Sequence, residues 1–223
     1  MSDSAISTTE HAPEHPPGLQ HHFAEMEQQA DSAKIGMWAF LVTEVLLFGG
    51  LFVGYGIMHA RFTEAFASAH HHLDRVMGTL NTVILLTSSW TMVMAVSSAR
   101  AGKQKNLVRY LTVTLLLAGA FLVVKYLEYS HKFHEGLLPG RFYTYAGPHL
   151  PEEFLFFSFY FMMTGLHGLH VLAGMIVISW LLRRAIRGDF SPSYYNPVDM
   201  GGLYWHLVDI IWIYLFPLIY LIS

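Results

Sequence analysis

Long apolar stretches, separated by shorter polar segments, dominate the pattern of this 223-residue chain. Five of them are each long enough to cross about 30 Å of hydrocarbon as a helix rising about 1.5 Å per residue. The pattern therefore predicts an all-α fold, a polytopic membrane protein that is a bundle of five transmembrane helices. The expected spans are Lys34–Met58, Val76–Ala99, Leu107–Tyr129, Glu153–Leu182 and Met200–Ile222.

The first 33 residues have a different pattern from the rest of the chain. They contain three prolines and many Ser, His and Glu residues, but no Lys or Arg. We expect residues 1–33 to form a polar, largely flexible tail, whose last part, Phe23–Ala33, becomes helical at the membrane surface. Residues 34–223 then make up one five-helix transmembrane domain.

Basic residues in two short links predict the orientation of the bundle. Both links follow an even number of spans, so both lie on one side of the membrane, and the positive-inside rule makes that side cytoplasmic. We therefore predict a cytoplasmic N-terminus and a C-terminus outside. The basic residues are Arg100, Lys103, Lys105 and Arg109 in the first link, and Arg183, Arg184 and Arg187 in the second.

Composition supports a membrane protein and excludes several kinds of chemistry. Only 13% of the residues are charged and 53% are hydrophobic, whereas soluble domains carry about a quarter charged residues. The net charge of −3 and the lack of a basic patch give no indication of a nucleic-acid partner. Cysteine is absent, which excludes disulfides, thiolate metal sites, iron–sulfur clusters and cysteine nucleophiles.

Two histidines lie near the middle of the fourth expected span, in the segment TGLHGLHVLAG. Because His167 and His170 are three residues apart, we expect both imidazoles to point toward one face of the helix. They cannot supply the opposite axial ligands of a single haem, although a tetrahedral zinc or copper site with His206 is chemically conceivable. We favour a structural role, in which these histidines bond to carboxylates or carbonyls.

Two carboxylates lie at a similar depth to these histidines. Glu44 lies about 15 Å into the bilayer, and Asp209 follows His206 by three residues. An ionisable group at that depth is a functional candidate, because its charged form is costly in hydrocarbon. A proton-handling role and a neutral, hydrogen-bonded structural role both remain open for Glu44. We expect Asp209 to accept a histidine N–H, and we predict one polar cluster between the helices formed by Glu44, His167, His170, His206 and Asp209.

The third expected span ends with a second pair of charged residues. Lys125 and Glu128 are three residues apart and predict a structural ion pair near the outer membrane boundary. Glu128 and His131 also form one E-x-x-H motif, but a di-iron carboxylate site needs two such motifs and further carboxylates. The sequence has no second E-x-x-H, so the metal-site interpretation is weak.

Two further groups of polar residues have simpler interpretations. The run His70–His72 lies in an outer loop, where a solvated turn is favoured over a metal site. The second span is rich in small polar side chains, which we expect to form hydrogen bonds between helices. These side chains are Asn81, Thr82, Thr87, Ser88, Ser89 and Thr91.

Several of these stretches together resemble subunit III of the haem-copper cytochrome c oxidases, in particular its bacterial five-helix branch. The matching segments are FLVTEVLLFGGLF around Glu44, LNTVILLTSS around Asn81, LEY at Leu127–Tyr129, TGLHGLHVLAG and YWHLVDIIWIYLF. They occur in the family's order and cover the chain from about Met37 to Leu221. The last two segments together are highly specific.

The resemblance implies an all-helical, non-catalytic subunit that binds no haem or copper, both of which belong to partner subunits. In the family, two groups of helices surround a V-shaped cleft that holds phospholipid, and the subunit supports proton uptake by catalytic subunit I and protects it against inactivation during turnover. The implied location is the bacterial inner membrane, and cytochrome c is the implied electron donor to the complex. Larger respiratory supercomplexes are compatible with this resemblance. The residues that match characteristic polar positions of the family are Glu44, Glu128, His167, His170, His206 and Asp209.

The chain departs from the family pattern in two respects. Mitochondrial-type members have seven spans, whereas this chain replaces the first two with a polar tail. Lys125 stands where many members have a neutral side chain, so its ion pair with Glu128 is inferred from spacing alone.

Other functions remain as alternatives. Within the family they are subunit III of a quinol oxidase and a homologue associated with nitric oxide reductase. Glu44 favours the cytochrome c branch, because quinol-oxidase members have Asp there. An autonomous membrane metalloenzyme is an alternative from another class. A secondary transporter is disfavoured, because the chain has no internal repeat and no broken helix beyond Pro217.

Overall fold

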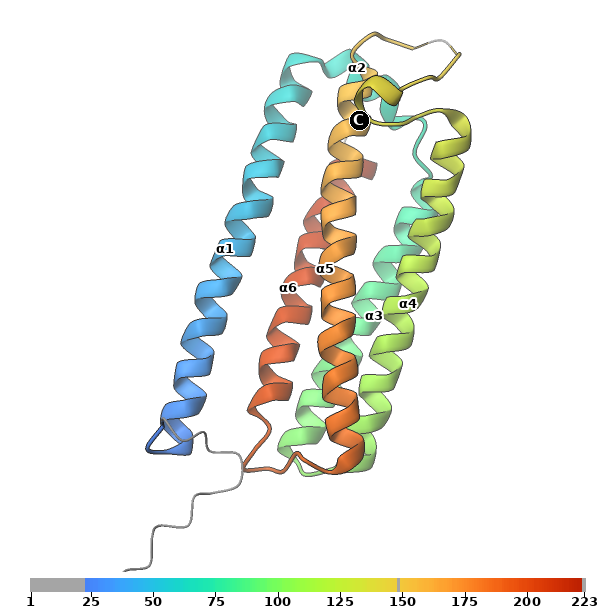
Figure 1. Cartoon of the computed structure of the whole chain (residues 1–223). Helices are drawn as coiled ribbons and strands as arrows, with labels where there is room; N and C mark the ends of the chain where they lie inside the picture. Colours follow the sequence, from blue (N-terminus) through green and yellow to red (C-terminus); the bar gives the residue numbers. More distant parts are fainter. Residues whose placement is uncertain (1–22, 148, 222–223) are drawn as a thin grey trace, which may run out of the picture.

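The computed structural model describes residues 23–147 and 149–221, which form a bundle of long helices (Figure 1). Within these residues, five helices are long and apolar enough to cross a membrane. A short helix, α2 (Thr63–His70), and a 3₁₀ turn, η1 (Gly140–Phe142), lie in the connections. The predicted all-α, five-span architecture is confirmed. The spanning helices are α1 (Met26–Arg61), α3 (Arg75–Arg100), α4 (Gln104–Glu135), α5 (Glu153–Arg187) and α6 (Asn196–Tyr220).

The helices differ from the predicted spans mainly at their ends. α1 begins at Met26, so most of the segment Phe23–Ala33 is helical, as expected. Residues 1–22 of the predicted tail lie outside the described residues. α4 continues to Glu135, because helical hydrogen bonding does not stop where the apolar sequence stops. Ile222, the expected end of the fifth span, also lies outside the described residues.

The start of α5 at Glu153 agrees with the prediction and has a clear local cause. The Glu153 carboxylate accepts hydrogen bonds from the Leu150 backbone N–H and the Tyr143 hydroxyl, each at 3.0 Å. Burial raises the pKa of Tyr143, and the bond to Glu153 raises it further. The phenol therefore stays protonated and keeps donating to the helix start.

The helices pack as a group of four with α1 at one side. α3 packs along α4 and α6, and α5 packs along the same two helices. α1 contacts α5 and α6 and diverges from α5 toward the end that carries the basic links (Figure 1). We call this the basic end of the bundle; its cytoplasmic location remains a prediction.

Hydrogen bonds between small polar side chains and tryptophans hold α3 in this group. The Trp205 and Trp212 indoles on α6 donate to Ser88 and Thr82 of α3, each at 3.0 Å. Thr91 of α3 pairs with Thr114 of α4 at 2.8 Å. The predicted interhelical bonding is confirmed for these α3 residues, although the side-chain amide of Asn81 has no partner among the described residues.

Large apolar side chains cover the outside of the bundle. Leu46, Leu116 and Ile176 are 69%, 68% and 72% exposed, on three different helices. Such a surface is stable against lipid tails or the apolar surface of a membrane partner, since neither offers hydrogen bonds. The bundle therefore has an apolar exterior and places its polar groups between helices.

The close approach of α5 and α6 depends on Gly174. A Cβ atom at this position would lie 2.7 Å from ring carbons of Trp205. We expect Gly174→Ala to lower the free energy of unfolding by about 1–3 kcal/mol, because the buried indole has to move. Gly168→Ala is the matched control on the same helix, since a Cβ there meets no atom within 4 Å. Chemical unfolding of the purified protein in detergent measures both changes, and equal losses would contradict the packing argument.

Candidate functional site

The two histidines of α5 point to different neighbours. His167 is 0% exposed and lies between the rings of Phe121 and Trp212, with centroid distances of 5.6 and 5.1 Å. His170 faces α1 instead. The prediction that both imidazoles share one face is wrong, because a three-residue step falls about 60° short of a full helical turn. Because α5 packs against several helices, side chains about 60° apart on it can face different neighbours: His167 meets α4 and α6, and His170 meets α1.

His170 connects α5 to α1 through Glu44. The His170 Nε2 atom lies 2.8 Å from Glu44 Oε2, and its Nδ1 atom lies 2.8 Å from the Leu166 carbonyl oxygen. Tyr204 of α6 donates a hydrogen bond to the His170 carbonyl at 3.0 Å. His170 thus bonds both to a carboxylate and to a carbonyl, as the structural interpretation predicts. Both side chains stay slightly accessible, 14% for Glu44 and 15% for His170.

His167 has no such partners. Neither of its ring nitrogens has a hydrogen-bond partner among the described residues. The prediction that it bonds to a carboxylate or carbonyl is therefore wrong for this histidine, which packs among aromatic rings.

On α6, His206 turns toward α3. Its Nδ1 atom lies 2.8 Å from the Ser89 hydroxyl oxygen. Asp209, one turn further on, is 4% exposed, and its Oδ1 atom is buried without a hydrogen-bond partner among the described residues. The predicted bond from a histidine to Asp209 is not formed, so that expectation is wrong.

The five predicted site residues therefore do not make one cluster. Glu44 pairs with His170 on the α1 side, whereas His206 pairs with Ser89 on the α3 side. A zinc or copper site built from His167, His170 and His206 is not assembled, because each of them faces a different helix. Within the part of the chain that the structure describes, no group of three or more His, Asp or Glu side chains is arranged to hold a metal ion.

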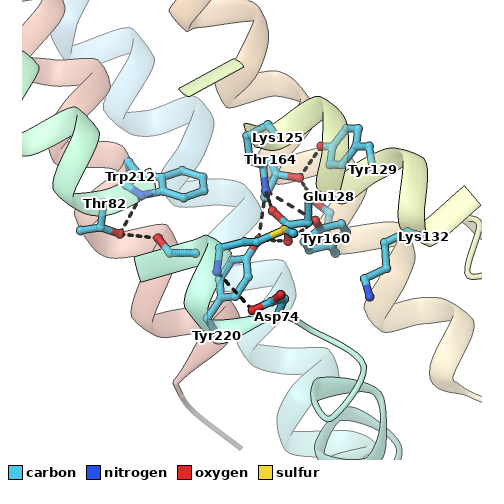
Figure 2. A network of polar contacts seen from close by, with 12 residues as sticks. Asp74, Thr82, Lys125, Glu128, Tyr129, Lys132, Tyr160, Thr164, Trp212 and Tyr220 are labelled. Carbon is cyan, nitrogen blue, oxygen red and sulfur yellow. Dashed lines mark hydrogen bonds and ion pairs between the residues drawn. The ribbon is translucent and has the colours of Figure 1, made fainter. Parts of the chain in front are cut away.

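A buried polar network surrounds Lys125 and Glu128 (Figure 2). Lys125 Nζ donates to Glu128 Oε2 and to the Tyr220 hydroxyl, both at 3.0 Å. The Tyr160 and Tyr220 hydroxyls donate to Glu128 Oε1 at 2.8 and 2.5 Å. Lys125 Nζ also lies 5.2 Å from the Trp212 ring centroid, within reach of a cation–π interaction. Three helices, α4, α5 and α6, thus share one buried charge pair.

The predicted ion pair is confirmed, but its surroundings were not predicted. Lys125 is 6% exposed and Glu128 is 1% exposed, so both side chains are buried between helices rather than on the lipid-facing surface of the bundle. Its two tyrosine partners, Tyr160 and Tyr220, come from other spans. Their location in expected spans does not by itself indicate that they contact this pair. His131 of the E-x-x-H motif points away and pairs with Glu135 at 3.0 Å.

The histidine run in the outer connection is only partly a solvated turn. His71 is exposed, but His70 is 1% exposed and its Nδ1 atom lies 3.3 Å from Arg75 Nη2. Lys132 of α4 donates to the backbone carbonyl of His72. The expectation of a solvated turn is wrong for His70, because this residue ends α2, a short helix that packs against α5 and buries the imidazole.

Two adjoining apolar grooves run between α1 and α6. Their volumes are about 310 and 300 Å³, and both are lined by Val45, Leu207 and Ile210. Trp38 and Leu203 border the first groove, which also reaches His206. Their walls are almost entirely hydrocarbon, which suits a lipid chain rather than a polar substrate.

The fold and these contacts define a class of protein: a polytopic helical membrane protein whose embedded acids, histidines and lysine mainly join helices. Comparison with known sequences narrows this class. Residues 20–223 match the family model for cytochrome c oxidase subunit III. The chain belongs to this family.

Individual relatives come from both quinol and cytochrome c oxidases. Quinol oxidase subunit 3 of Bacillus spizizenii is 31% identical over 203 residues, 90% of this chain and 93% of the relative. Cytochrome c oxidase subunit 3 of Corynebacterium diphtheriae is 31% identical over 191 residues, 85% of this chain and 87% of the relative. Cytochrome bo(3) ubiquinol oxidase subunit 3 of Pseudomonas aeruginosa is 28% identical over 220 residues, 99% of this chain and 98% of the relative.

The buried charge pair generates a specific prediction. Lys125→Met should destabilise the protein by about 3–5 kcal/mol, because Glu128 is left as an uncompensated buried charge. Adding Glu128→Gln to Lys125→Met should restore most of the lost stability, since the amide oxygen still accepts hydrogen bonds from the tyrosines and no buried charge remains.

Unfolding of the single and double variants in detergent measures this coupling. His131→Ala is the matched control on the same helix, because an exposed pair contributes about 0.2–1 kcal/mol. A double variant as unstable as Lys125→Met would contradict the charge-pair argument.

Proposed function

We propose that this chain is the non-catalytic subunit III of a proton-pumping respiratory cytochrome c oxidase in the bacterial inner membrane. It stabilises catalytic subunit I, holds phospholipid and supports proton uptake, while haem and copper lie in partner subunits. The observation that carries the proposal is the family match over residues 20–223. The geometry supports it, because the polar groups of the spans join helices and apolar side chains face outward.

The grooves between α1 and α6 are the proposed phospholipid site. Their apolar walls fit acyl chains. Trp38 borders one groove, and tryptophan side chains favour the headgroup region of a membrane. Glu44 and His170 lie close by and link α1 to α5. Loss of this link would let α1 separate from the four-helix group and open the groove.

A quinol oxidase is the second candidate for the parent complex. Relatives named as quinol oxidase subunits match this chain about as well as those named as cytochrome c oxidase subunits. Turnover of the purified complex with reduced cytochrome c and with a quinol separates the two candidates, and we expect cytochrome c to be the donor. Migration in native gels tests for membership of a supercomplex.

Purification through a tag on the N-terminal tail tests the proposal directly. We expect larger subunits to co-purify in mild detergent, with a haem absorbance spectrum and with iron and copper in proportion to the catalytic subunit. The isolated chain, stripped of its partners, should retain neither metal. Stoichiometric iron or copper on the chain alone would overturn the accessory-subunit proposal and favour the metalloenzyme.

The Glu44–His170 link yields a mutational prediction. Glu44→Ala should leave the haem spectrum of the complex unchanged, but weaken α1 docking by about 1–3 kcal/mol through the lost hydrogen bond. We therefore expect fewer bound phospholipids and fewer turnovers before inactivation, measured by lipid phosphorus and by oxygen uptake. Glu27→Ala, an exposed carboxylate on the same helix, serves as the control. Complete loss of haem in Glu44→Ala would contradict the prediction.

A further inference from the structure

A cavity of about 290 Å³ lies between α3 and α6 at the basic end of the bundle. Both helices have an end there, because α3 ends at Arg100 and α6 begins at Asn196. Arg100 and Asp199 line the cavity, and Arg100 Nη2 donates to Asp199 Oδ1 at 2.7 Å. The end of a spanning helix lies near the headgroup layer of a membrane. The cavity therefore places two opposite charges at the depth of lipid headgroups.

Arg100 and Asp199 can each bind a further charged group without separating. Their side chains are 56% and 21% exposed, so neither is sealed inside the bundle. A guanidinium has several N–H donors, and among the described residues Asp199 is the hydrogen-bond partner of this one. A carboxylate accepts hydrogen bonds at both oxygens, so Asp199 can accept from a second cation while it keeps Arg100. An anion can thus bind at the guanidinium and a cation at the carboxylate.

The cavity adjoins the apolar grooves between α1 and α6. Leu203 and His206 line both the cavity and the first groove, and neither residue is buried. The two grooves follow α6 from Leu203 to Tyr214, which is about 16 Å at about 1.5 Å per residue. One leaflet supplies half of a hydrocarbon core that is about 30 Å thick. The grooves therefore have the length of the acyl chains of one leaflet.

We propose that this cavity binds the headgroup of a phospholipid that carries a primary ammonium group beside its phosphate, as phosphatidylethanolamine does. The phosphate accepts hydrogen bonds from the Arg100 guanidinium, and the ammonium group donates to the Asp199 carboxylate. The acyl chains of the same lipid lie in the grooves between α1 and α6. The site and the headgroup each carry one positive and one negative charge, so binding leaves no charge without a partner.

Charge and hydrogen bonding distinguish this headgroup from two other common ones. The glycerol headgroup of phosphatidylglycerol has no cation for Asp199, so the carboxylate would face a net negative charge. The quaternary ammonium of phosphatidylcholine is positive but has no N–H to donate. A primary ammonium both balances the charge of Asp199 and donates a hydrogen bond to it.

This inference deepens the proposed function, on which it rests for the presence of a phospholipid in the grooves. It concerns a different contact from the Glu44–His170 link, which joins α1 to α5. Two matched variants isolate the part of Asp199. Asp199→Asn removes the charge at nearly constant shape, whereas Asp199→Glu keeps the carboxylate.

Lipid retention by the full chain, purified with whatever subunits accompany it, tests the assignment. The protein is reconstituted in equal parts of phosphatidylethanolamine, phosphatidylcholine and phosphatidylglycerol with identical acyl chains. It is then extracted in mild detergent, and the lipids that remain bound are quantified by mass spectrometry.

We expect phosphatidylethanolamine to be enriched about tenfold over the other two lipids, as one additional charge-assisted hydrogen bond implies. Asp199→Asn should abolish this preference, and Asp199→Glu should keep it. Arg100→Gln should lower the retained phosphatidylethanolamine about tenfold, because the phosphate loses its charged partner. Asp189→Asn is the matched control, since Asp189 pairs with Arg184 at the same end of the bundle, and it should retain the preference.

Four results would overturn the assignment: no headgroup preference, a preference for phosphatidylglycerol, an unchanged preference in Asp199→Asn, or unchanged retention in Arg100→Gln. Equal loss in Asp199→Asn and Asp199→Glu would also contradict it, because that result indicates altered packing rather than a lost charge. The measurement needs neither haem nor turnover. If the chain purifies without oxidase subunits, the proposed function fails, while the ratio of retained lipids still decides the headgroup.

Discussion

The structure depends on one constraint: a charged or hydrogen-bonding side chain inside the bilayer has to find its partner within the protein. The buried pair of Lys125 and Glu128 meets this constraint with tyrosines from two other helices. Because the pair joins α4, α5 and α6 at the end opposite the basic links, those helices cannot slide past one another without exposing a charge to lipid. Packing and electrostatics therefore specify the same arrangement.

The spans and the ion pair of Lys125 and Glu128 were predictable from the sequence, because both are local patterns. Contacts that depend on which helix lies opposite were not predictable in this way. His167 and His170 are three residues apart, yet one meets aromatic rings and the other meets Glu44. The burial of His70 in α2 was equally unpredictable, since a short helix in a connection has no periodic signal of its own.

The two sides of α6 have different chemistry, and this difference organises the candidate site. Toward α1 the helix borders almost entirely apolar grooves, whereas toward α3 it borders a cavity whose wall includes the ion pair of Arg100 and Asp199. His206 and Leu203 line both spaces. The same turn of α6 thus borders a groove suited to lipid chains and a cavity with charged residues in its wall.

The hydrogen bond from Tyr220 to Glu128 has a consequence for biogenesis. The two residues are 92 positions apart, so Lys125 and Glu128 are synthesised well before the tyrosine that completes their network. During that interval Lys125 and Glu128 have only each other and, later, Tyr160. Because Tyr220 is the last residue of α6, the network around Glu128 is complete only once the final turn of that helix is in place.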